Sequence, residues 1–220
     1  MLLTSMDIDP SDEADFNRWY DREHLQERVA IDGFLEARRY VAHEGHEGHP
    51  KYLCLYSTAT VDVLDSPTYR TVLANPTDWS TKTMARFKNM IRAVARITIS
   101  RGNGRGAALG IVRLRPAAGA KDTLRAVLRN MLDPGGLDAI ISMHLIESDP
   151  ALSKPMTDDP SVANPGAGDW FVLIDGTQVR PISIVISARF TDNAALKSAV
   201  ISSGVYDLTW DLAKSDIPAV

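Results

Sequence analysis

The sequence has little cysteine, no long apolar run and no large excess of either charge. Its single cysteine, Cys54, cannot form an intrachain disulfide, which excludes a disulfide-stapled scaffold and fits a reducing compartment. No apolar run approaches the roughly 18 residues of a membrane-spanning helix. The opening residues, MLLTSMD, lack the basic start of a signal peptide. We therefore expect a cytoplasmic protein with no membrane partner.

Composition places the chain among ordinary globular proteins. Its 220 residues are 45% hydrophobic and 24% charged, which excludes a disordered or collagen-like chain. The 24 basic and 28 acidic residues give a net charge of -4, which argues against nucleic acid as a partner. The length exceeds one minimal ferredoxin-like unit and is short for two large independent domains.

The predicted elements follow a similar order in two parts of the chain, separated by a glycine-rich segment at residues 101–106. In the first part we expect strands at 2–6, 34–43, 52–56 and 92–101, a helix at 12–29, and helical turns over 60–87 that Pro67 and Pro76 interrupt. In the second part we expect strands at 109–114, 137–147, 170–175, 183–190 and 205–212, and helices at 121–132 and 192–203.

This order predicts the fold class α+β, with two ferredoxin-like βαββαβ halves. We place the first half at residues 1–102, a linker at 103–106 and the second half at 107–220. An antiparallel sheet with both helices on one face leaves its other face bare, and a bare apolar face is a liability. We therefore expect the two sheets to pack face to face as a pseudo-dimeric α+β barrel.

The predicted helix at 12–29 carries ionisable groups on its apolar side. On a wheel that advances about 100° per residue, His24 lies about 80° from Phe16, and a further set lies within about 60° of it. That set is Trp19, Tyr20, Glu23 and Glu27. Carboxylates that face an apolar wall are costly unless they are paired or reach water. The candidate partners are Arg28, Arg38 and Arg39. A polar cavity between helix and sheet would explain the pattern and would shift pKa values as acid–base catalysis requires.

Three segments of the first half resemble the signature of EthD-like proteins, which belong to the dimeric α+β barrel superfamily. They are residues 19–25 (WYDREHL), 33–34 (GF) and 38–40 (RRY). The resemblance implies ferredoxin-like halves and a pocket lined by the first helix and the sheet, and its matched positions are Trp19, Tyr20, His24 and Tyr40. Superfamily members include cofactor-independent isomerases, decarboxylases, monooxygenases and dehydratases. The helix expected at 121–132 has no aromatic residue and no histidine, so we expect a single site, in the first half.

Alternation along the predicted strands sorts other candidates by face. Glu36, Arg38 and Tyr40 share a face with Phe34, whereas Leu35, Ala37, Arg39 and Val41 share the opposite one. Tyr52, Cys54 and Tyr56 likewise lie together. Both sheet faces should be buried, so the sequence leaves open which set meets the helices. Tyr40 and Tyr56 are either pocket hydroxyls or core tyrosines, and Cys54 is expected to be an inert core thiol.

Two further patterns invite a functional interpretation. The loop at 43–49 holds His43, His46 and His49 with two glutamates, but its glycine spacers favour a solvated hairpin tip, and we expect no metal site. Residues 79–120 contain many Lys and Arg and no Asp or Glu, which is typical of salt bridges between halves and a solvated edge.

The leading hypothesis is a small-molecule enzyme that performs cofactor-free acid–base chemistry, such as isomerisation, dehydration or decarboxylation. The residues expected to carry the reaction are His24, Glu23 and Glu27, and those expected to bind substrate are Trp19, Tyr20, Arg38, Arg39, Tyr40 and Tyr56. His24 is alternatively a helix-surface or capping histidine. We expect no haem or flavin, and a homodimer is open. The competing hypothesis is a non-catalytic module for ligand binding or assembly.

Overall fold

The computed structural model describes residues 1–45, 50–154, 164 and 166–218. The elements of the first half are β1 (Leu2–Asp7), α1 (Glu13–Trp19), the π-helical turn η1 (Tyr20–His24), α2 (Leu25–Ala30), β2 (Phe34–Ala42), β3 (Tyr52–Thr58), η2 (Val61–Asp65), α3 (Pro67–Ala74), α4 (Asp78–Met84) and β4 (Lys88–Gly102). Those of the second half are β5 (Ala108–Leu114), α5 (Lys121–Met131), β6 (Ile140–Ser148), β7 (Trp170–Gly176), α6 (Val179–Ile186), the π-helical turn η3 (Ser187–Thr191), β8 (Val200–Ala213) and η4 (Lys214–Asp216).

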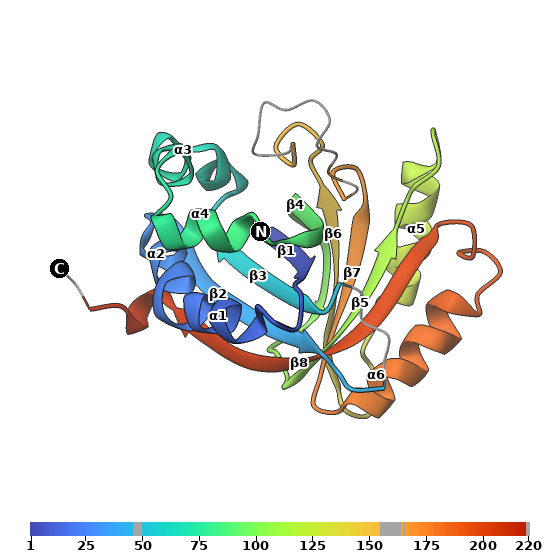
Figure 1. Cartoon of the computed structure of the whole chain (residues 1–220). Helices are drawn as coiled ribbons and strands as arrows, with labels where there is room; N and C mark the ends of the chain where they lie inside the picture. Colours follow the sequence, from blue (N-terminus) through green and yellow to red (C-terminus); the bar gives the residue numbers. More distant parts are fainter. Residues whose placement is uncertain (46–49, 155–163, 165, 219–220) are drawn as a thin grey trace.

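The strands form a closed antiparallel barrel in the order β1-β3-β2-β8-β5-β7-β6-β4. Within it, β4-β1-β3-β2 and β8-β5-β7-β6 repeat one ferredoxin-like order, which confirms the predicted fold class. The helices lie outside the barrel, with α1 to α4 on one side and α5 and α6 on the other (Figure 1). Among the described residues, no helix is long and apolar enough to cross a membrane.

Two long strands close the barrel. The first part of β4 pairs with β1, from Lys88 to Val94, and the rest pairs with β6, from Ala95 to Gly102. In the same way β8 pairs first with β5 and then with β2. Each half therefore lends its last strand to the other half's sheet, which leaves no unpaired sheet edge at either junction.

Apolar side chains gather in three clusters. One fills the barrel interior and includes Leu3, Leu53, Leu55, Leu109, Ile146 and Phe171. A second lies between the first-half sheet and its helices, around Phe16, Trp19 and Leu25. The third lies between the second-half sheet and α5 and α6. Both faces of each sheet are therefore buried, as the bare-face argument requires.

The helical turns expected at 60–87 are confirmed, and both prolines act as helix boundaries. Pro67 is the first residue of α3, where a missing N–H costs nothing, and Pro76 lies just before α4. The side chain of Ser66 accepts a hydrogen bond from the Tyr69 N–H and caps α3. This cap fixes the helix that presents Tyr69 to the site described below.

Two predictions near the C-terminal end were wrong. Residues 183–190, expected as a strand, lie in α6 and η3. Their β-branched run favours a strand, but Ile182, Val185 and Ile186 follow helical spacing and are all buried against the second-half sheet. The helix expected at 192–203 is also absent: turns lead into β8, which begins at Val200 because it must reach both β5 and β2.

Candidate functional site

A π-helical turn interrupts the helix that was expected to run unbroken over 12–29. The N–H of Leu25 bonds to the carbonyl of Tyr20, five residues back, so the turn contains one extra residue. One extra residue rotates everything after it backwards by about 100°. On the wheel, His24 and Arg28 then move to within about 20° of Phe16, while Glu27 moves to about 80° away. The turn thus exchanges a carboxylate for a guanidinium on the inward face.

A cavity of about 70 Å³ lies between this helix and the first-half sheet. Its apolar lining comes from β1, α3 and the stretch from α4 to β4, including Leu2, Leu73 and Phe87. Its polar lining is Thr4, Tyr20, His24, Arg28, Tyr56, Tyr69 and Arg92. No Asp or Glu is among the described residues that line it. We refer to this space as the inner cavity.

Buried polar atoms without hydrogen-bond partners gather around the inner cavity. They are Thr4 Oγ1, His24 Nδ1, Arg28 Nη1, Tyr56 Oη and Arg92 Nε, none of which has a partner of normal geometry among the described residues. Buried polar groups in folded proteins are almost always satisfied, and each that is not costs about 1–3 kcal/mol. Their convergence on one small space is the pattern of a site that binds a polar group.

His24 is fixed by stacking and held in its neutral form. Its ring lies 4.1 Å from the Trp19 ring, at 29° between planes, and meets the Tyr20 ring edge-on at 5.1 Å. Burial, and then the charges of Arg28 and Arg39, hold the pKa of His24 well below its usual 6.5. A neutral imidazole with a free ring nitrogen can accept a proton or a hydrogen bond at pH 7.

The hydroxyls of Tyr20 and Tyr56, which line the cavity, are protonated at any ordinary pH. Burial raises the pKa of Tyr56 well above 10, and it raises that of Tyr20 in the same way. Tyr20 donates to the sulfur of Met6 at 3.7 Å. Because its hydroxyl stays protonated, Tyr56 is a donor, and it has no acceptor of normal geometry among the described residues.

Glu23 serves as an acceptor at the contact between α4 and the first helix. It accepts hydrogen bonds from Trp19 Nε1 at 3.1 Å, Thr77 Oγ1 at 2.6 Å and Ser80 Oγ at 3.0 Å. Glu27 is half-buried, and neither glutamate lines the inner cavity. Burial and then the charge of Glu23 raise the pKa of Glu27.

The other expected binding residues divide between the two faces of β2. Arg38 and Tyr40 turn toward the barrel interior, where Arg38 Nη1 donates to the Tyr40 hydroxyl at 2.8 Å and to Asp175 Oδ1 at 3.2 Å. Arg39 turns toward the helices, 4.3 Å from the Tyr20 ring and hydrogen-bonded to Asn17 at 2.5 Å. The structure therefore places Trp19, Tyr20, His24, Arg39 and Tyr56 in one layer and Arg38 and Tyr40 in another.

The structure also decides which strand faces meet the helices. Ala37, Tyr52, Cys54 and Tyr56 belong to the helix-facing cluster, and Leu53 and Leu55 belong to the interior. Phe34 joins Ala37 rather than Tyr40, because the register of β2 shifts between Phe34 and Glu36. Burial raises the pKa of the Cys54 thiol to about 12, which fits the inert role expected for it.

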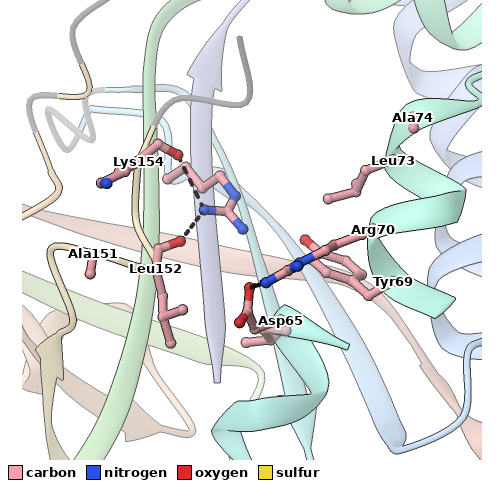
Figure 2. A pocket seen from close by; sticks show the side chains of 10 residues that line it. Asp65, Tyr69, Arg70, Leu73, Ala74, Ala151, Leu152 and Lys154 are labelled. Atoms are coloured by element: carbon pink, nitrogen blue, oxygen red, sulfur yellow. Dashed lines mark hydrogen bonds and ion pairs between the residues drawn. The ribbon is translucent and has the colours of Figure 1, made fainter. Parts of the chain in front are cut away.

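A larger pocket of about 350 Å³ adjoins the inner cavity (Figure 2). The two share Tyr69, Leu73 and Arg92 as lining. Figure 2 shows Tyr69, Arg70 and Leu73 of α3 across the pocket from Ala151, Leu152 and Lys154, which follow β6. We call this space the outer pocket. Sequence reasoning did not find Thr4, Tyr69 or Arg92. The available signal for Arg92 was its place between Ile91 and Ala93 on an apolar strand.

Several residues of the remaining charged patterns form ion pairs. Arg113 and Arg115 both pair with Asp169 within the second half, and Arg105 of the linker pairs with Glu36 of the first half. In the loop at 43–49, His43 pairs with Asp207 at 2.6 Å, whereas His46, Glu47 and His49 lie outside the described residues. Within the part of the chain that the structure describes, no group of side chains is arranged to hold a metal ion.

Comparison with known proteins shows the fold. No family model and no curated protein matches the sequence. An anthrone oxidase-like protein matches over 100% of this chain and 94% of its own, with 7% identity and a TM-score of 0.63. A proposed monooxygenase of Lactobacillus acidophilus NCFM matches over 97% and 95%, with 10% identity and a TM-score of 0.54. A mutant chlorite dismutase of Candidatus Nitrospira defluvii, in complex with cyanide, matches over 95% and 90%, with 8% identity and a TM-score of 0.52. The chain has the dimeric α+β barrel fold.

The inner cavity is small for a large cofactor. Its volume of about 70 Å³ lies far below the roughly 300–1,000 Å³ typical of pockets that enclose drug-sized ligands. A planar macrocycle such as haem, or a flavin ring system, does not fit there. The space fits a head group of a few heavy atoms, with any larger body in the outer pocket.

Proposed function

We propose that this protein is an enzyme that performs cofactor-independent proton-transfer chemistry on a small organic molecule, of the isomerase, dehydratase or decarboxylase type. The observation that carries the proposal is the convergence of unpaired polar atoms on the inner cavity, with the free Nδ1 of His24 among them. Acid–base catalysis needs a positioned base in its basic form, and burial keeps the His24 imidazole neutral.

In the proposed reaction, Nδ1 of His24 removes a proton from an activated C–H or O–H of the substrate. The electron pair left behind moves onto a substrate oxygen, where Arg28 and the Tyr56 hydroxyl offer unused donors. In an isomerisation the imidazolium returns the proton to another atom of the substrate, and in a dehydration it gives the proton to the departing hydroxide, which leaves as water. In a decarboxylation His24 takes the proton from the acid O–H of a β-keto acid, the C–C bond pair moves onto the ketone oxygen as carbon dioxide leaves, and the imidazolium then protonates the enolate carbon. Stacking on Trp19 holds the ring in place throughout.

We also propose that the chain is EthD-like. Supporting this, Trp19 and His24 of the resembling helix stack beside the inner cavity, and Tyr20 lines it. Gly33 of the glycine-aromatic turn has φ +86°, and a Cβ there would lie 2.5 Å from a Val63 methyl, so glycine is needed. The names of two structural neighbours, an anthrone oxidase-like protein and a proposed monooxygenase, fit an enzyme acting on small organic molecules.

The experiment is solvent deuterium exchange. The protein is incubated in D₂O with a panel of small ketones, phenols and β-keto acids, and loss of the acidic C–H signal is followed by proton NMR. We expect catalysed exchange for at least one compound, reduced about 10²–10⁴-fold by His24→Gln, because general base catalysis contributes that much. The matched control is His144→Gln, which alters a partly buried histidine that is bonded to Ser100 and Ser142 and does not line the cavity.

No exchange with any compound, or equal exchange by the wild type and His24→Gln, would contradict the proposal. A compound that stabilises the protein without being exchanged would support the competing function, a non-catalytic ligand-binding module.

A further inference from the structure

Two arginines that line the inner cavity are buried and form no ion pair with a carboxylate of the described residues. Arg28 and Arg92 are 5% and 7% exposed. Arg28 donates no side-chain hydrogen bond to any described residue, and its Nη1 is buried. Arg92 donates from Nη1 to the carbonyls of Leu152, at 2.7 Å, and Lys154, at 3.5 Å, while its Nε has no partner within the described part of the chain.

Other buried arginines show what compensation looks like in this protein. Arg38 is also 5% exposed, and it pairs with Asp175 at 3.2 Å. Arg39 is 3% exposed and lies 3.5 Å from Asp21. A buried cation without an anion is costly, because desolvation is not offset by attraction. The inner cavity concentrates two such cations, so its most favourable occupant is an anion.

The other polar groups of the inner cavity suit the same occupant. The hydroxyls of Thr4 and Tyr56 can donate, and no described carboxylate lines the space to repel a negative charge. Guanidinium groups bind planar carboxylates with two parallel hydrogen bonds, which suits a cavity of about 70 Å³.

The outer pocket suits the rest of such a molecule. It adjoins the inner cavity at Arg92, and Leu64, Leu73 and Leu152 contribute apolar lining. Its charged lining is Lys154 and the ion pair of Arg70 with Asp65. Leu73 of α3 and Leu152 lie on opposite sides of the outer pocket (Figure 2). An apolar tail of several carbons can therefore lie in the outer pocket while its charged end reaches Arg92.

From these observations we infer that the site takes a small organic carboxylate, with its charged head between Arg28 and Arg92 and its apolar body in the outer pocket. This inference names the substrate class of the proposed enzyme and rests on that proposal only for the reaction. A carboxylate bound between Arg28 and Arg92 would bring the adjoining part of the molecule to the cavity that His24 also lines.

The test measures binding of sodium hexanoate to the full chain by calorimetry and by thermal unfolding. We expect the Tm to rise with the logarithm of hexanoate concentration, because the ligand binds only the folded form. Hexanamide, its neutral counterpart, and sodium chloride at equal ionic strength should give little or no shift. Affinity should increase from acetate to butyrate to hexanoate as the tail fills the outer pocket. Equal shifts from hexanamide or from chloride would overturn the inference.

Three variants at two equally buried arginines, Arg28 and Arg38, separate an effect on binding from an effect on stability. Arg28→Met should raise the Tm of the ligand-free protein by about 2–4 °C, since it removes an uncompensated charge, and weaken hexanoate binding by about ten- to a hundredfold. Arg28→Lys, which keeps the charge, should retain part of the affinity. Arg38→Met, outside the cavity, should lower the Tm and leave hexanoate affinity within about twofold, because it strands the buried Asp175. A lower ligand-free Tm and an unchanged affinity in Arg28→Met would contradict the assignment.

Failure of this inference is distinguishable from failure of the proposed function. If the protein exchanges neutral ketones in a way that depends on His24, and shows no preference for carboxylates, the proposed enzyme function holds and the inference of a carboxylate substrate is wrong. Binding of hexanoate that depends on Arg28, with no exchange of any compound, does the reverse.

Discussion

The two halves build their helix–sheet layers in the same way, but the first layer encloses a polar cavity and the second a packed apolar cluster. Each lies on one side of the barrel, and each contains a π-helical turn, η1 in the first half and η3 in the second. In the first layer the turn brings His24 and Arg28 to a cavity with unpaired polar atoms. In the second, Phe190 at the turn is fully buried in an apolar cluster, and no described residue of α5 or α6 has an unpaired buried polar atom. A π turn alone therefore does not make a site; the polar groups that it aims inward do.

The largest expected effect is a difference in the free energy of unfolding between variants at the two π-helical turns, η3 and η1. Phe190→Ala should lower the free energy of unfolding by about 3–5 kcal/mol, because it empties a fully buried aromatic position. His24→Ala should cost less than about 1 kcal/mol, because the ring already borders open space. Urea denaturation of the two variants measures both values. Equal losses would mean that the first layer is packed like the second.

A second prediction concerns Glu23, for which the sequence suggested a catalytic role. Glu23→Gln should lower the free energy of unfolding by about 1–3 kcal/mol, because the carboxylate accepts three side-chain hydrogen bonds. Deuterium exchange should change by less than about threefold, a bound set by the absence of Glu23 from the cavity lining. The control is Glu13→Gln, whose partly exposed pair with Lys51 contributes less than about 1 kcal/mol. If Glu23→Gln lost most of the deuterium exchange while its free energy of unfolding stayed unchanged, Glu23 would have a catalytic role.

The third prediction is a pH dependence of stability. The pKa of His24 is lower in the folded protein than the 6.5 of the unfolded chain, so the unfolded state binds more protons below pH 6.5. The resulting penalty is absent above pH 6.5 and grows by at most about 1.4 kcal/mol per pH unit as the pH falls toward the folded pKa. Urea unfolding of the wild type and His24→Gln between pH 7.5 and 5 isolates this slope. Parallel curves would show that the folded imidazole titrates normally.

The smallest expected effect tests the rotation caused by the π turn. Glu27→Gln should change the free energy of unfolding by no more than about 0.5 kcal/mol and leave exchange unaltered, because the side chain lies outside the inner cavity. If Glu27→Gln lost exchange to the extent expected for His24→Gln, a regular α-helix without the π turn would describe the site better.

The fold was largely predictable because strand and helix patterns repeat along the chain. Turn signals such as Pro67, together with alternating strands, gave the element order and the barrel. The segment at 183–190 misled because its β-branched residues favour a strand, while its contacts with the second-half sheet select a helix.

The site was only partly predictable, for two physical reasons. His24, Trp19 and Tyr20 stand out as aromatic and ionisable residues on one helix. The position of Arg28 depends on a π turn that a regular wheel of about 100° per residue does not contain. Tyr69 and Arg92 come from distant segments that meet His24 only in the folded chain. The division of Arg38 from Arg39 required knowing which face of β2 meets the helices.

The central claim is that His24 is a neutral imidazole, its Nδ1 without a partner among the described residues, in a cavity that receives an anion. The most direct measurement is a ¹⁵N NMR titration of the His24 ring with and without hexanoate. The account predicts a neutral ring well below pH 6.5 and a change in the Nδ1 resonance when hexanoate is added to the wild type but not to Arg28→Met. A ring that titrates near pH 6.5, with Nδ1 unaffected by hexanoate, would contradict it.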